Sequence, residues 1–193
     1  MRVGHWALAG CFLGAWLTSD SEYFAVLHLL FGYSILAILL FRLSWGFIGS
    51  RYARWGSFIF SRGETWSYLK GMVTASGRDY PGHNPLGSIG IFLMLGLLSL
   101  MIGSGLALDF LSPTHWVSEI HEMLAELMLI LISVHVLGVL FSGWLHHQRL
   151  IPAMIHGRKA NVSDGLQIPH SYSSGLVLLL TFLGLSVYYV LSR

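Results

Sequence analysis

Two histidines, His121 and His135, lie 14 residues apart within one long apolar segment, residues 120–145. On an α-helix this separation is close to four turns, so both imidazoles project from nearly the same face, about 21 Å apart along the axis. That distance is most of the roughly 30 Å apolar thickness of a bilayer. Imidazole is a usual axial ligand of haem iron. The pair therefore predicts two haems stacked across a membrane, each needing a second ligand from another helix.

His5 and His28 are the candidates for these second ligands, because each lies in or beside an apolar run. A single histidine in a membrane helix can instead be a hydrogen-bonded packing residue, and for His5 taken alone the sequence does not decide between the two roles. Polar side chains inside membranes are costly and usually functional. The spacing of His121 and His135 on one helix favours ligands over packing residues.

The composition indicates a membrane protein. Apolar residues make up 54% of the chain and charged residues 10%, whereas a soluble domain carries about 25% charged residues. The mean hydropathy is +0.66. In lipid such segments form helices, because each backbone polar group must be bonded within its own segment. We expect an all-α bundle with five spans, the first of them short, at residues 3–19, 23–47, 86–110, 118–145 and 173–191.

Basic residues predict the orientation of the chain, because they collect on the cytoplasmic side of a membrane. The connections at residues 18–22 and 111–117 contain no Lys or Arg. We therefore expect a bacterial inner-membrane protein with its N-terminus in the cytoplasm and its C-terminus in the periplasm. The basic residues precede the first span or lie in the two other connections: Arg2; Arg51, Arg54, Arg62, Lys70 and Arg78; Arg149, Arg158 and Lys159.

This topology sorts the four histidines by depth. The first span starts in the cytoplasm, so His5 is near the inner surface, whereas the second starts outside, which puts His28 near the outer surface. The fourth span also starts outside, so His121 is outer and His135 inner. The matched pairs are His28 with His121 and His5 with His135, and each pair is expected to hold one haem.

A set of short motifs occurs in order along the chain: Arg2-x-x-His5-Trp6, His28-x-x-x-Gly32-Tyr33, Arg42-x-x-Trp45-Gly46, Arg51-Tyr52-Ala53-Arg54, Gly82-His83-Asn84-Pro85-Leu86-Gly87, His121-Glu122, His135-x-x-Gly138-Val139 and Ala153-Met154-Ile155-x-Gly157-x-Lys159. In these motifs the chain resembles the bacterial cytochrome b561 and nickel–iron-hydrogenase b-type cytochrome superfamily over roughly residues 1–160. The resemblance implies a four-helix core with two b-type haems, each held by two of the histidines His5, His28, His121 and His135. It also implies electron exchange between the quinone pool and a partner.

Two features depart from that family. Only 23 residues separate His5 from His28, fewer than expected for the family, and the span at 173–191 is additional to a four-helix core. We therefore divide the chain into a dihaem domain at residues 1–160 and a linker with an extra C-terminal helix at residues 161–193. The resemblance gives this helix no role.

Further cofactor contacts are expected at the inner surface. Haem propionates are anions that favour Arg and amide donors, so Arg2, Arg42, Arg54, His83 and Asn84 are candidates. Arg42 could instead extend to lipid phosphates. A quinone is expected between Arg42, Trp45 and His83. Residues 51–75 alternate aromatic with basic side chains and predict an interfacial helix, which would either cover a quinone pocket or anchor the connection.

Two acidic residues and one cysteine also lie within the expected spans. Glu122 and Glu126 lie on a common stripe off the histidine face, and Glu126 is either part of a proton route or a neutral acid facing the extra helix. Cys11 is the only cysteine, so there is no internal disulfide. Covalent haem attachment is not expected, because no Cys-x-x-Cys-His motif occurs. A lipoprotein cleavage site at residues 8–11 is an alternative reading, but its apolar region is too short.

These observations predict a transmembrane electron carrier that joins the quinone pool to a periplasmic redox protein, such as a hydrogenase, a c-type cytochrome or another dehydrogenase. It would be an electron-transfer subunit, with a homo-oligomer or a larger complex as further expectations and no binding of nucleic acid. An alternative is an enzyme that oxidises superoxide at the outer haem and reduces quinone, but an anionic substrate wants a positive outer surface. The outer connections instead carry Asp20, Glu22, Asp109 and Glu119. A passive anchor without haem is a third possibility, which the four depth-matched histidines oppose.

Overall fold

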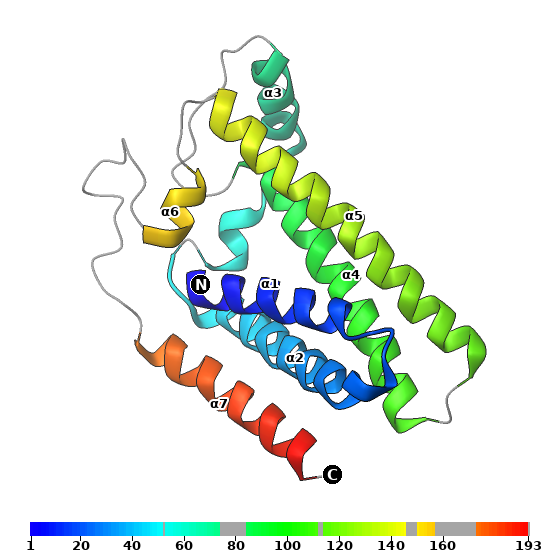
Figure 1. Cartoon of the computed structure of the whole chain (residues 1–193). Coiled ribbons are helices and arrows are strands. Elements are labelled where there is room, and N and C mark those ends of the chain that lie inside the picture. The colour runs from blue at the N-terminus through cyan, green and yellow to red at the C-terminus, as the bar shows by residue number, and fades with distance from the viewer. Residues whose placement is uncertain (52, 74–83, 112–113, 146–149, 157–172, 193) are drawn as a thin grey trace.

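The computed structural model describes residues 1–51, 53–73, 84–111, 114–145, 150–156 and 173–192, and within them every regular element is a helix (Figure 1). The predicted all-α bundle is confirmed. The long helices are α1 (Arg2–Leu17), α2 (Ala25–Ile48), α4 (Pro85–Phe110), α5 (His115–Leu145) and α7 (Ser173–Leu191). The shorter elements are the 3-10 helices η1 (Glu22–Phe24) and η2 (Trp55–Phe58) and the α-helices α3 (Arg62–Val73) and α6 (Leu150–His156).

Within the described parts of the chain, four helices are long and apolar enough to cross a membrane: Glu22–Ile48, Pro85–Phe110, His115–Trp144 and Ser173–Leu191. The expected span at residues 3–19 differs, because α1 has only 16 residues, and a span usually needs about 17–25. The helix ends where Thr18 bonds back to it, the Thr18 hydroxyl donating to the Gly14 carbonyl at 2.7 Å. The polar turn that follows ends the helix, and α1 packs along α2.

The chain forms two helical hairpins, α1–α2 and α4–α5, each closely packed within itself. Figure 1 shows that the N-terminus, α3 and α6 lie at one end of the molecule, and that both hairpin turns and the C-terminus lie at the other. We call the first the basic end, since it carries Arg51, Arg54, Arg62 and Lys70, and the second the acidic end, since it carries Asp20, Glu22, Asp109 and Glu119.

One buried cluster joins the two hairpins. It draws residues from α1, α2, α4 and α5, so the hairpins share a core near the middle of the bundle. Its fully buried members are Phe12, Ile35, Leu39, Leu98, Met101, Ile102, Leu124 and Met128.

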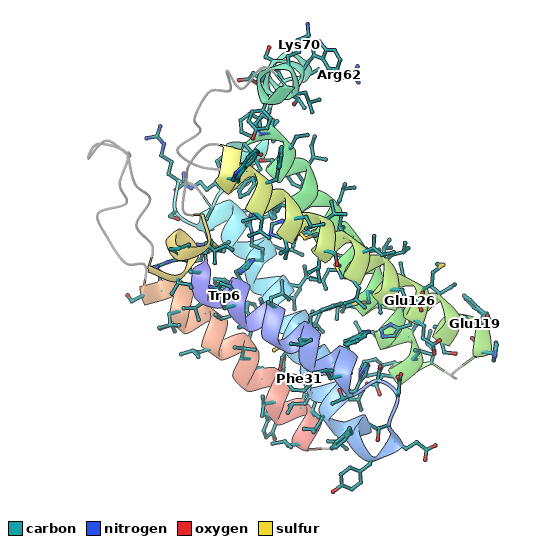
Figure 2. The ribbon with its side chains drawn as sticks, turned by 45° about the horizontal axis from the view of Figure 1, so that its top comes forward. Trp6, Phe31, Arg62, Lys70, Glu119 and Glu126 are labelled. Carbon is teal, nitrogen blue, oxygen red and sulfur yellow. The ribbon has the colours of Figure 1, made fainter. Side chains whose placement is uncertain are left out.

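Helix α7 packs along α2 and is therefore an integral part of the bundle. Leu179 of α7 shares a second buried cluster with Ile38, Phe41 and Trp45 of α2. The approach is close, since a Cβ added to Gly175 would lie 2.8 Å from the Trp45 ring. Glu126 cannot face this helix, because it is exposed on α5, and Figure 2 places it on the side of the bundle away from α7. The predicted domain boundary at residue 160 lies outside the described residues.

Candidate functional site

The structure brings His28 of α2 and His121 of α5 together near the acidic end. Their ring centroids are 6.3 Å apart and the ring planes are inclined by 76°. Two imidazoles that bind one metal from opposite sides, with metal–nitrogen bonds of about 2 Å, place their centroids roughly 6 Å apart. Both side chains are half-buried. The separation therefore suits an iron bound between the two rings.

Hydrogen bonds fix which ring nitrogen each histidine offers. The Nδ1 of His28 lies 2.9 Å from the Ala15 carbonyl, and the Nδ1 of His121 lies 3.1 Å from the Met101 carbonyl. A carbonyl only accepts, so in both rings Nδ1 carries the proton and donates. The Nε2 atoms are then left with free lone pairs, the form in which imidazole binds metal.

Ser104 adds a second acceptor for His121. Its hydroxyl donates to the Met101 carbonyl at 2.8 Å and lies 2.9 Å from the His121 Nδ1. Gly105 completes the seat, because a Cβ there would stand 3.1 Å from the His121 ring. Helix α4 thus positions the His121 ring in three ways: the Met101 carbonyl and the Ser104 hydroxyl contact Nδ1, and Gly105 leaves room for the ring. The sequence reasoning passed over Ser104, although a hydroxyl in an apolar helix is itself a signal of a polar neighbour.

The second pair, His5 of α1 and His135 of α5, lies toward the basic end. The two imidazoles are close enough to interact electrostatically; His135 is half-buried, and His5 is exposed in the described structure. The Trp6 ring meets the His5 ring edge to face, with centroids 5.4 Å apart. The structure thus brings together the two pairs that depth matching predicts, on opposite halves of the continuous helix α5.

Residues on either side of His5 bind the start of α1 to α6. The Arg2 Nη1 donates to the Ile155 carbonyl at 3.0 Å and the Trp6 Nε1 donates to the Met154 carbonyl at 3.3 Å. Both acceptors belong to the last turn of α6, where helix carbonyls are left without partners within the helix. Arg2, a candidate for a propionate, therefore has a structural partner as well.

The arrangement of the helices suits a flat macrocycle between the hairpins. Over the described residues, α5 packs against α4 but has few close backbone contacts with α1 or α2, although its histidines face those helices. Gly32 lies one turn after His28 on the same face of α2, and a Cβ there would meet no described atom within 4 Å. Within the described ranges no three His, Cys, Asp or Glu gather around a common point. Pairs of imidazoles suit haem, whose ring supplies the other ligands of the iron.

The remaining predicted contacts have structural partners at the basic end. The Arg42 guanidinium donates to the Ala53 carbonyl at 3.1 Å and lies 4.3 Å from the centre of the Trp55 ring. The Arg54 Nε donates to the Gly49 carbonyl at 2.8 Å. Asn84 begins α4 by accepting from the Gly87 N–H at 2.7 Å. Cofactor contact by these three residues stays a prediction, and Arg42 keeps further donors for it.

Trp45 and His83 are the other two residues of the predicted quinone site. Trp45 is buried, stacked on Phe41 with centroids 5.7 Å apart and covered by Gly175. Its ring thus packs in the α2–α7 interface. The predicted contact between Trp45 and a quinone stays a prediction. His83 lies outside the described residues.

The chain matches a known protein family. A family model described as prokaryotic cytochrome b561 matches residues 1–157. That segment contains all four paired histidines and ends before α7. No curated protein and no solved structure matches the chain.

Proposed function

Because the chain belongs to the prokaryotic cytochrome b561 family, whose members transfer electrons across membranes through b-type haem, we propose that it carries two such haems. His28 and His121 bind one, and His5 and His135 bind the other. The observation that carries this proposal is the geometry of the first pair, whose rings stand 6.3 Å apart with both Nδ1 atoms directed at carbonyls.

The ligand histidines would determine where the two haems lie in the bundle. The two iron centres supply one-electron chemistry, and α5 holds one ligand of each about 21 Å apart along its axis. The carbonyls of Ala15 and Met101 accept from the Nδ1 atoms of His28 and His121, which orients both rings and leaves Nε2 as the nitrogen that would bind iron. The apolar clusters of the two hairpins exclude water from the space between the sites. The bundle is thus suited to moving electrons without moving protons through its centre.

The proposed circuit joins the quinone pool at the basic end to a periplasmic redox protein at the acidic end, in a bacterial inner membrane. The concentration of Arg and Lys at one end supports a cytoplasmic location for that end. The acidic turns at the opposite end support docking of a protein with a basic surface. A hydrogenase, a c-type cytochrome or another dehydrogenase would fill that role.

Quinone is proposed to bind near Arg42 at the basic end. Arg42 offers unused donors to a quinone carbonyl, and the Trp55 and Phe58 rings beside it provide flat apolar surfaces. Trp45 would support the site indirectly, by packing α2 against α7, without contacting the quinone. His83 remains part of the proposal.

Rapid reduction of the oxidised protein by a quinol tests the circuit. In the wild type we expect reduction of both haems, with the haem at the basic end first. In His135→Ala the haem at the acidic end should be reduced at least tenfold more slowly, because its donor is missing. Equal rates of reduction in the two proteins would place quinol oxidation at the acidic end. Arg42→Gln combined with His83→Ala should slow the first phase, and Arg51→Gln serves as a control of equal charge change.

Oxidation of superoxide remains a second hypothesis, and the charges oppose it. Asp20, Glu22, Glu119 and Glu122 surround the acidic end and are exposed or half-buried. An anionic substrate is repelled by such a surface. The relay therefore explains the charge distribution better than an enzyme that acts on superoxide.

A further inference from the structure

A pocket of about 460 Å³ lies at the basic end, between the short helix α3 and the start of α4. It is distinct from the two histidine pairs. Aromatic and aliphatic side chains form nearly all of its wall, and the charged side chain in that wall is Arg62. The residues that line it are Phe58, Ile59, Phe60, Arg62, Thr65, Trp66, Leu69, Pro85, Ile89 and Phe92.

The wall on the bundle side is a rigid aromatic stack. The Trp55 and Phe92 rings are stacked with centroids 5.8 Å apart, and Phe58 meets Phe92 at 6.3 Å. The Arg42 guanidinium also packs over Trp55, 4.3 Å from the ring centre. Phe58 is buried. The pocket therefore has one preformed wall, which holds its shape without a ligand.

Helix α3 forms the opposite wall, and its N-terminus is capped by its own side chains. The Ser61 N–H donates to the Glu64 carboxylate at 2.8 Å and the Glu64 N–H donates to the Ser61 hydroxyl at 3.2 Å. This reciprocal pair is a capping box, and the bond from the Ser61 backbone lowers the pKa of Glu64. The cap fixes the first turn of α3, which carries Arg62.

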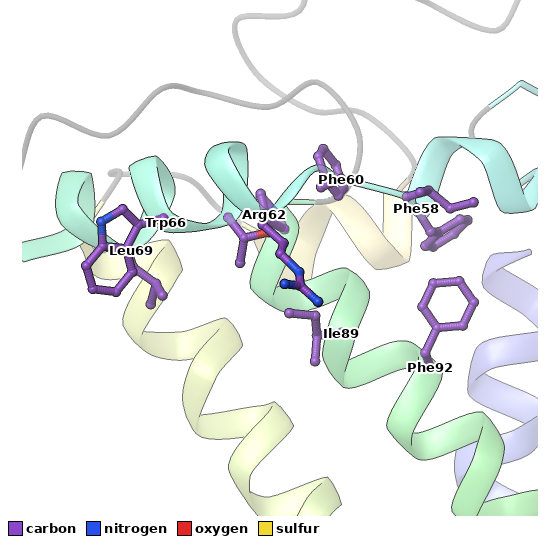
Figure 3. Close-up of a pocket in the computed structure, with 10 residues that line it drawn as sticks. Phe58, Phe60, Arg62, Trp66, Leu69, Ile89 and Phe92 are labelled. Atoms are coloured by element: carbon purple, nitrogen blue, oxygen red, sulfur yellow. The ribbon is translucent and has the colours of Figure 1, made fainter.

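Figure 3 shows the Arg62 side chain extending from α3 toward α4, beside Ile89, with Trp66 and Leu69 on the same side of α3. The apolar wall is open to the surroundings, since Ile59 is 72% and Trp66 59% exposed. In a membrane this exposed wall faces lipid at the depth where α4 begins. A cation that enters an open apolar groove at the membrane surface is suited to an anion with an attached hydrocarbon chain.

We propose that this groove binds an anionic phospholipid, with its phosphate on Arg62 and one acyl chain along Ile89 and Phe92. Charge supports the choice over a neutral ligand, because residues 49–73 carry Arg51, Arg54, Arg62 and Lys70 against a single acid, Glu64. The bound lipid would hold α3 against the preformed aromatic wall of the bundle.

Native mass spectrometry of the haem-loaded protein tests the site, using delipidated protein titrated with dioleoyl-phosphatidylglycerol or dioleoyl-phosphatidylcholine. We expect the wild type to retain one phosphatidylglycerol in preference to phosphatidylcholine. Arg62→Gln should weaken phosphatidylglycerol binding about fivefold, the effect of one cation near a lipid surface. Arg51→Gln, with the same charge change at the basic end but not among the residues that line the groove, should change binding less than twofold.

A second variant separates the groove from surface charge. Ile89→Trp fills the groove without a change of charge and should weaken binding of both lipids. Equal losses in Arg62→Gln and Arg51→Gln would mean diffuse attraction and overturn the proposal. Retention of decylubiquinone in place of phosphatidylglycerol, lost in Ile89→Trp, would identify the groove as a quinone site and also overturn it.

Discussion

The two histidine pairs are held in different ways. At the acidic end both rings bond directly to backbone carbonyls, His28 to Ala15 and His121 to Met101. At the basic end His5 lies in the first turns of α1, and the bonds to α6 come from its neighbours Arg2 and Trp6. Helix ends open more readily than helix interiors. The acidic-end site is therefore expected to be the rigid one, and the basic-end site the one that depends on a remote segment.

A glycine exchange should have the largest effect on the acidic-end site. In Gly105→Val the new side chain begins 3.1 Å from the His121 ring, and both the ring and α4 are fixed by hydrogen bonds. We expect loss of more than half of one haem per chain, measured as the haem-to-protein ratio of purified protein, with the basic-end haem kept.

Gly103→Val is the matched control on the same helix, because a Cβ at Gly103 meets no described atom within 4 Å. It should retain both haems. Equal haem loss in the two variants would show that α4 tolerates no β-branched residue and would remove the argument for a seat around His121.

The basic-end site should respond to the loss of the bonds to α6. Arg2→Gln combined with Trp6→Phe removes two hydrogen bonds, each worth about 1 kcal/mol, so haem dissociation at this end should quicken by roughly tenfold or more. Transfer of haem to apomyoglobin, followed by absorbance, measures it. Trp16→Phe at the other end of α1 is the control, and a faster loss of the acidic-end haem instead would contradict the comparison.

Ser104→Ala should have a smaller effect, because the His121 Nδ1 keeps the Met101 carbonyl as its acceptor. Loss of one of two acceptors is worth about 1 kcal/mol or less. We expect haem dissociation at the acidic end to quicken less than fivefold, with the low-spin spectrum unchanged. Ser99→Ala on the exposed face of α4 should change nothing. A high-spin haem in Ser104→Ala would mean that the hydroxyl, not the carbonyl, orients the ring.

The smallest expected effect concerns the partner. Exposed charges at a transient contact change the association rate by only a fewfold and are screened by salt, with a Debye length of about 8 Å at physiological ionic strength. Electron exchange with the periplasmic partner should slow as salt rises. It should also slow when Asp20, Glu22 and Glu119 are changed together to Asn or Gln. A stopped-flow rate that is flat in salt would exclude electrostatic docking at the acidic end.

The sequence predicted the all-α membrane bundle and the family, and its depth matching named the histidine pairs that the structure brings together. Depth could be predicted because helical rise and the alternation of span direction fix it without any knowledge of packing. Haem ligation by these pairs stays a prediction. The lateral arrangement was not predictable in the same way. Nothing in the apolar pattern of residues 173–191 says that Gly175 lies against Trp45, so Trp45 was assigned to a quinone rather than to the core.

The length of α1 and the environment of its ligand were also missed. The apolar run ends at Leu17, and α1 ends there too, because the Thr18 hydroxyl donates to the carbonyls of Gly14 and Ala15. The expected span ran two polar residues further, to residue 19. The bonds from Arg2 and Trp6 to α6 join residues about 150 positions apart. Such contacts depend on how the two hairpins and the segment after α5 meet.

Haem content with redox titration of His121→Ala and His135→Ala tests the central claim most directly. We expect the wild type to hold two low-spin haems with separate midpoint potentials. Each variant should lose one of them, and the two variants should retain haems of different potential, His121→Ala the basic-end haem and His135→Ala the acidic-end haem. Two low-spin haems in either variant, or the same retained potential in both, would contradict the assignment of one haem to each histidine pair.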